Sequence, residues 1–189
     1  MADNLLLTVT LLLILVAVVV LIARILTNMR TSSNWIKDWQ QLAQDNNLTY
    51  REMLGQSNVT GMYQGRLVNL LGSVKAGTSI LITTNNWENN YLEIKSKGIP
   101  ARSSRDPEAQ FRDGLSIESR SSEFTNHLFS NMHLRHRLAP LAIIPNLTIT
   151  LSGAELALRT PSVIHEPEDV VAYLDVLSDL AGQIEAIRE

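Results

Sequence analysis

An apolar run close to the N-terminus constrains this chain more than any other feature. Residues 5–23 contain no charged residue, no Gly and no Pro, and only two threonines are polar. At about 1.5 Å rise per residue, a helix over residues 5–26 matches the thickness of the hydrocarbon core of a bilayer. Arg24 lies near the end of this helix, where its long side chain can reach the interface. We therefore predict a transmembrane anchor over residues 1–30 that contacts the lipid bilayer through residues 5–26.

A cleaved secretory signal is the alternative interpretation of this run. Signal peptides have a basic N-terminal region, a shorter apolar segment and a small-x-small cleavage site. Here the chain begins Met-Ala-Asp-Asn and the run ends Ile-Ala-Arg-Ile-Leu, so a retained signal anchor is favoured. Asp3 precedes the run, whereas Arg24, Arg30 and Lys37 follow it. The positive-inside rule then predicts a single-pass membrane protein whose N-terminus is outside and whose C-terminal domain is cytoplasmic.

Residues 31–189 are enough for one soluble domain with a hydrophobic core and too few for two. This part of the chain holds 14 basic and 18 acidic residues, a balance that argues against nucleic acid as a partner. The chain contains no Cys, which excludes thiol catalysis and thiolate metal sites. We predict a single soluble domain behind the anchor.

The pattern of apolar residues predicts an α+β fold with an antiparallel sheet. Alternation indicates strands over residues 49–54, 59–63, 66–73, 79–84, 91–96, 115–119, 147–151 and 155–159. Helical spacing indicates helices over residues 34–44, 122–129 and 132–138, and a long C-terminal helix that begins near Pro167. The apolar stripe of that last helix consists of Val170, Tyr173, Leu174, Leu177, Leu180, Ala181, Ile184 and Ile187. Residues 97–112, rich in Gly, Pro, Ser and Arg, are predicted to be the longest and most mobile loop.

A hairpin motif, Gly61-x-Tyr63-x-Gly65-Arg66-x-Val68, is the most distinctive sequence of the domain. Gly65 suits a tight turn, Gly61 allows a bulge or close packing, and Tyr63 and Arg66 face each other across the strands. A functional alternative is that Arg66 binds a carboxylate or phosphate. With the Trp39 helix and the acidic terminal helix, this motif resembles a loosely defined group of bacterial membrane-anchored or soluble domains of unknown function. The resemblance implies an α+β fold and no activity.

A segment without acidic residues separates Glu123 from Glu155. It contains His127, His133, Arg135, His136 and Arg137. Because no carboxylate lies in the segment, we predict no metal site from these histidines. The segment either contacts a partner or anionic headgroups, or it is a solvated helix face paired with distant acids.

The predicted loop mixes both signs of charge. Asp106, Glu108 and Asp113 alternate with Arg102, Arg105 and Arg112, which compete for the same carboxylates, so a solvated loop is favoured over a cation site.

The sequence contains no Gly-x-Ser-x-Gly elbow, His-Glu-x-x-His pair, phosphate loop or dinucleotide fingerprint. We therefore predict no catalytic, cofactor-binding or metal-binding residues, and a non-enzymatic accessory or scaffold protein that binds a protein partner, within a membrane complex or beside one. The alternatives are a membrane-tethered enzyme or small-ligand binder, and a sensor of anionic lipid surfaces. The candidate contact residues are Arg66, Arg102, Arg105, His133, Arg135, His136 and Arg137.

Overall fold

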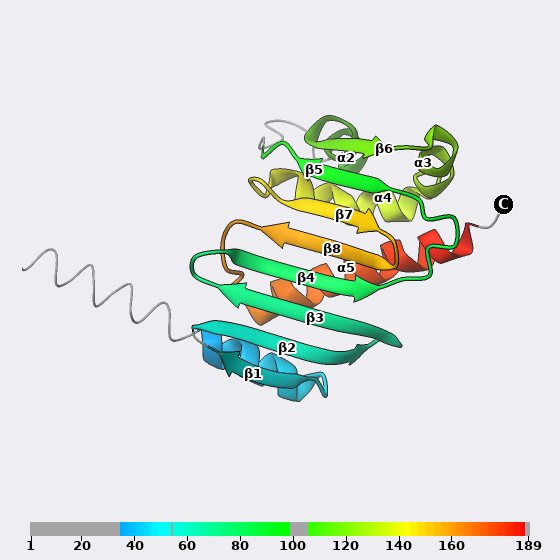
Figure 1. The fold of residues 1–189 in the computed structure, drawn as a ribbon. Helices are drawn as coiled ribbons and strands as arrows, with labels where there is room; N and C mark the ends of the chain where they lie inside the picture. Colours follow the sequence, from blue (N-terminus) through cyan, green and yellow to red (C-terminus); the bar gives the residue numbers. More distant parts are fainter. Residues whose placement is uncertain (1–34, 54, 99–105, 188–189) are drawn as a thin grey trace, which may run out of the picture. The chain divides into compact units, whose positions relative to one another are not determined.

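The computed structural model describes residues 35–53, 55–98 and 106–187. The anchor predicted over residues 5–26 lies outside the described residues, as do Arg102 and Arg105. Among the described residues, no helix is long and apolar enough to cross a membrane. Residues 38–189 form one compact unit, and its fold is α+β (Figure 1).

One antiparallel sheet of eight strands runs through this unit, in the order β1-β2-β3-β4-β8-β7-β5-β6. The strands are β1 (Thr49–Met53), β2 (Gln56–Tyr63), β3 (Arg66–Ser73), β4 (Gly77–Thr83), β5 (Leu92–Ser96), β6 (Leu115–Ser119), β7 (Thr148–Ser152) and β8 (Glu155–Thr160). The first four strands form a meander, and β8 pairs with both β4 and β7. The last strand of the chain therefore joins the early strands to the later ones in a single sheet (Figure 1).

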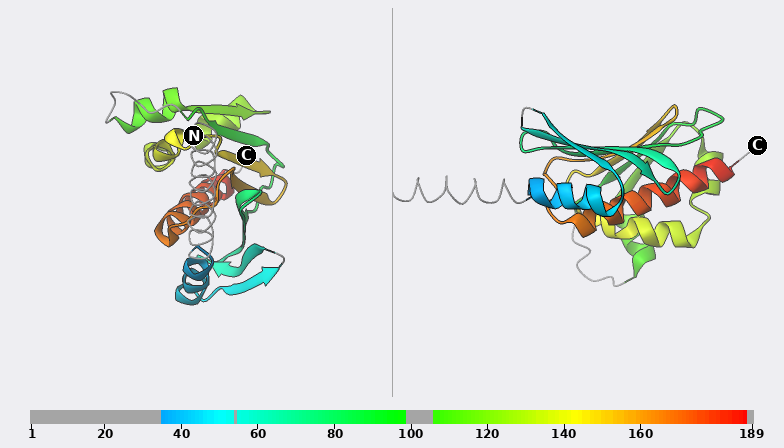
Figure 2. Two further views of the ribbon diagram at one scale, coloured as in Figure 1. Left: turned by 90° about the vertical axis from the view of Figure 1, so that its left-hand side faces the viewer. Right: turned by 90° about the horizontal axis from the view of Figure 1, so that it is seen from below.

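The helices are short except for the last one. They are α2 (Pro107–Gly114), α3 (Ser122–Leu128), α4 (Met132–Leu138), the 3-10 helix η1 (Ala139–Ile143) and α5 (Pro167–Ala186). Residues 35–45 are also helical. Figure 2 shows α4 and α5 on the same face of the sheet. α5 packs against the central strands β4 and β8 and against α4.

The core lies between the sheet and this helical layer. Alternate residues of each central strand point into it, so that Ile80 and Ile82 of β4 and Leu158 of β8 are at most 1% exposed. From α5, the predicted apolar stripe supplies Val170, Leu174, Leu177, Leu180 and Ala181, all fully buried. Trp39 is also fully buried, and its indole nitrogen donates to the carbonyl of Ile164 at 3.0 Å. The predicted antiparallel α+β fold with a long C-terminal helix is thus confirmed.

Part of the predicted loop is a helix. The prediction of a loop over residues 97–112 is wrong from Pro107 onward, where α2 begins. The Asp106 side chain accepts from the backbone nitrogen of Glu108 at 3.1 Å and so caps the helix. Pro107 occupies the first turn, where its missing N–H costs no intrahelical hydrogen bond. Phe111 then fixes α2, because its ring is 8% exposed and lies 5.3 Å from the ring centroid of Phe129. Residues 99–105 of the predicted loop lie outside the described residues.

The burial of α5 predicts a large effect of truncating one of its central side chains. Leu177 is fully buried, so Leu177→Ala should lower the free energy of unfolding of the full-length protein by about 2–5 kcal/mol. Leu67→Ala makes the same change at a side chain that is 54% exposed and should cost at most about 0.5 kcal/mol. Denaturant unfolding of both variants measures the difference. Equal effects would show that α5 contributes little to the core.

Candidate functional site

The hairpin between β2 and β3 forms as its motif indicates. Gln64 (φ 48°) and Gly65 (φ 77°) both have positive φ, as a two-residue type I′ turn requires. Tyr63 and Arg66 are paired across the two strands. A Cβ atom on Gly61 would lie 2.8 Å from Cδ2 of Leu48, so this glycine serves close packing. The structural interpretation of the motif is confirmed.

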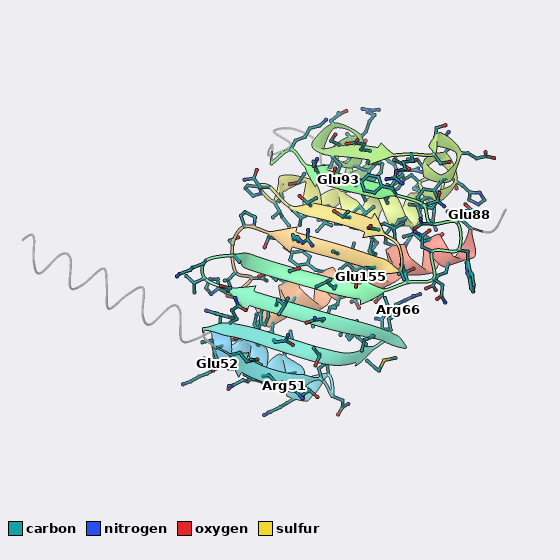
Figure 3. The ribbon with its side chains drawn as sticks, viewed as in Figure 1. Arg51, Glu52, Arg66, Glu88, Glu93 and Glu155 are labelled. Carbon is teal, nitrogen blue, oxygen red and sulfur yellow. The ribbon has the colours of Figure 1, made fainter. Side chains whose placement is uncertain are left out.

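Arg66 binds a carboxylate of its own chain. Its Nη2 donates to Oε2 of Glu185 at 2.7 Å, and its Nη1 donates to Oε1 of the same side chain. Glu185 also accepts from the backbone nitrogen of Asn85 at 2.9 Å and from Oγ1 of Thr84 at 3.3 Å. The Arg66 hydrogen bond is the main cause that lowers the pKa of Glu185 to about 2. Figure 3 shows Arg66 at the end of the sheet strands next to the last turns of α5. Arg66 therefore ties the hairpin to α5.

A second carboxylate of α5 fixes the tip of this hairpin. Asp175 accepts from the Tyr63 hydroxyl at 2.7 Å and from Nε2 of Gln64 at 2.8 Å. Burial, and then the hydrogen bond to Asp175, raise the pKa of Tyr63 to about 12. The phenol thus stays protonated and keeps donating at any ordinary pH.

Arg135 joins α4 to α2 and to the turn before α4. Its Nε donates to Oε2 of Glu108 at 2.8 Å, and its Nη1 donates to the carbonyls of Phe129 and Ser130. Nε2 of His136 lies 3.1 Å from the other oxygen of Glu108. The hydrogen bond from Arg135 holds the pKa of Glu108 below its usual value. Arg135 is therefore a positioning residue of the fold, with a side chain that is 23% exposed.

Arg137, one turn of α4 away from His133, points toward α5. Its Nε donates to Oδ2 of Asp179 at 3.0 Å. The acid-free segment is thus paired in space with acids from α2 and α5, and pairing with distant acids is the interpretation that the structure shows for both arginines. His133 is exposed at the start of α4. Arg135, His136 and Arg137 lie together on α4. Arg66 lies on β3 and contacts Glu185, near the C-terminal end of α5.

The carboxylates predicted to lie in the loop each have a partner within the fold. Asp106 caps α2, Glu108 binds Arg135, and Asp113 pairs with Arg112 at 3.1 Å on the surface. In residues 35–53, 55–98 and 106–187, no group of three or more His, Asp or Glu side chains could hold a metal ion.

A groove between η1 and α5 was not foreseen from the sequence. Its volume is about 430 Å³. The lining residues are His136, Arg137, Pro140, Leu141, Ile143, Ile144, Asp169, Ala172, Tyr173 and Val176. Tyr173 belongs to the predicted apolar stripe of α5, but it is partly exposed and lines the groove. Burial raises the pKa of its phenol. The available sequence signal is a pair of isoleucines, Ile143 and Ile144, that follows α4 after residues 139–142.

The sequence matches no family model and no curated protein. Among solved structures, the fold is similar to that of the mycobacterial trehalose monomycolate transport factor A, TtfA. The TM-score is 0.59 at 10% sequence identity, and the similarity covers 82% of this chain and 97% of the other. At this identity, the likeness concerns the fold alone.

The low pKa of Glu185 predicts a pH-dependent contribution to stability. A carboxyl whose pKa is lowered on folding contributes stability above its unfolded pKa near 4.5, and this contribution is lost as the pH falls toward about 2. Glu185→Gln should therefore lower the free energy of unfolding at pH 7 by about 1.5–3 kcal/mol. The difference between the variant and the natural protein should shrink as the pH falls from about 5 to about 2. Denaturant unfolding across this range measures it.

Asp113→Asn provides the matched control for this experiment. It neutralises a carboxylate whose side chain is 69% exposed and whose partner Arg112 is also exposed. Its stability at pH 7 should be close to that of the natural protein. A constant effect of Glu185→Gln at every pH would contradict the assigned ion pair.

Proposed function

We propose that this chain is a membrane-associated accessory protein that acts by binding a protein partner in a transport complex. The fold likeness to a protein named as a transport factor is the observation that carries the proposal. Arg66, Arg135 and Arg137 form ion pairs that each connect separate elements of the fold. Such ion pairs hold a surface in one shape, which lowers the entropy cost of binding.

The apolar run over residues 5–23 supports attachment to a membrane. The basic residues that follow it support a cytoplasmic position of residues 31–189. In this arrangement, the domain would meet its partner at the inner surface of the bilayer.

The partner would contact the α4 surface, which we define as Met132, His133 and Arg137. Met132 is 58% exposed, His133 is exposed, and the Arg137 side chain is 38% exposed. Met and Arg are enriched in protein interfaces. Arg135 lies on the same helix but is committed to Glu108 and two backbone carbonyls, so we assign it no direct contact.

Charge reversal at the α4 surface tests this proposal. Full-length tagged protein is purified in mild detergent, and the recovered partner is quantified by mass spectrometry. Arg137→Asp should reduce recovery severalfold at low salt, and the loss should shrink as salt rises, because exposed charges are screened. Arg159→Asp makes the same change at an exposed position on β8 and should leave recovery unchanged.

A double exchange separates contact from folding. Arg137→Asp combined with Asp179→Arg restores the ion pair between α4 and α5 but inverts the charge that α4 presents. Recovery should remain low in this double variant. If the exchange restores recovery, Arg137 acts only through its ion pair with Asp179, and the proposed contact is wrong.

The proposed topology has its own test. Protease added to intact cells or spheroplasts should leave the domain uncut, because the basic residues follow the apolar run of residues 5–23 and favour the cytoplasm. Immunoblotting against a C-terminal tag reads the result, and detergent lysis confirms that the protease is active. Digestion of the domain in intact spheroplasts would reverse the orientation.

A further inference from the structure

The groove between η1 and α5 is lined by both apolar and polar side chains. Pro140, Leu141, Ile143, Ile144, Ala172 and Val176 line it with carbon atoms. Ile143 is 52% exposed, although it belongs to a short helix whose neighbours Leu141 and Ala142 are buried. An apolar side chain of this size that borders a cavity gains free energy when a ligand removes it from water.

Four polar side chains also line the groove: His136 and Arg137 from α4, and Asp169 and Tyr173 from α5. Nε of Arg137 is engaged by Asp179, whereas its terminal nitrogens donate no hydrogen bond to any described residue. Apolar lining with a few converging polar groups is typical of small-molecule sites.

The size of the groove favours a small ligand over a protein segment. Its volume of about 430 Å³ falls in the lower part of the usual range for ligand pockets, about 300–1,000 Å³. Ten residues line it, whereas a stable protein interface takes about 20–30 residues from each side. The cavity at Arg66 is smaller, about 250 Å³, and is lined mainly by polar and charged residues such as Gln64, Thr83 and Glu185.

We infer that the groove between η1 and α5 binds one acyl chain of an amphiphile, whose polar head contacts Arg137, His136 and Tyr173. The inference deepens the proposed function and rests on it, since a domain held at a bilayer surface would meet such chains. A free fatty acid and a membrane phospholipid share this chemistry, and separate probes distinguish them.

Photo-crosslinking tests the inference with the full-length protein. One arm uses a fatty acid with a diazirine in its chain, and the other uses vesicles that contain a phospholipid with the same chain. Mass spectrometry then locates the labelled residues. We expect labelling in residues 139–144 and 169–176 in at least one arm, and the arm that labels identifies the source.

Ala172→Trp places an indole in the groove from an exposed position on α5. Labelling at the groove should fall about tenfold or more, because each methylene excluded from an apolar site weakens binding about fourfold. Ala186→Trp is the matched control, since Ala186 is also exposed on α5 but does not line the groove. Ile143→Glu is a second variant that puts a charge at the lip, and it should also reduce labelling. Unfolding curves confirm that each variant is folded.

Labelling that is absent from the groove in both arms, or unchanged in Ala172→Trp and Ile143→Glu, would overturn the inference. Labelling of a copurifying protein in place of the groove residues would also overturn it. Flotation of the protein with the vesicles is measured in parallel. Failure to float would contradict the proposed membrane association, while the fatty-acid arm still decides the acyl site.

Discussion

The packing of α5 across the centre of the sheet is the interaction on which the rest of this structure depends. Its fully buried stripe covers β4 and β8, the two strands through which the early and late parts of the sheet join. Three of its acids reach outward in different directions: Asp175 to the β2–β3 hairpin, Asp179 to α4, and Glu185 to Arg66 and Asn85. Apolar burial supplies the stability, whereas these directional contacts fix how the hairpin and α4 sit against the helix.

Local sequence patterns predict most of the strands and helices, because the strands and α5 each bury one face. Alternation marked β3 and β4, helical spacing marked α5, and Gln64-Gly65 marked a turn with two positive φ values. The error at α2 has a physical cause, because the Gly, Pro and Ser content of residues 97–112, Pro107 included, is typical of a loop. Behind an Asp106 cap, the same proline is a good first residue of a helix, and the Asp-Pro-Glu order was itself the available signal.

The arrangement of the site could not be obtained in this way, because its partners are distant in sequence. Glu108 and Arg135 are 27 positions apart, Arg137 and Asp179 are 42 apart, and Arg66 and Glu185 are 119 apart. The sequence around α4 contains no acidic residue, so the positive charges of α4 are without a nearby acid in the sequence. In the fold, α2 and α5 bring carboxylates to these charges. The pairing of β8 with β4 is equally non-local, since it places Thr160 opposite Thr78.

The groove follows from the way α4 ends. Pro140 has no N–H and cannot continue the hydrogen-bond ladder of α4, so the chain tightens into η1 directly after Leu138. Leu141 and Ala142 still reach the core, but Ile143 is left half in water and faces the same cavity as Ala172 and Tyr173 of α5. A larger residue at position 172 would fill this space. With Ala at position 172, the Arg137–Asp179 pair joins α4 to α5, and the apolar surface beside that pair stays accessible to a ligand.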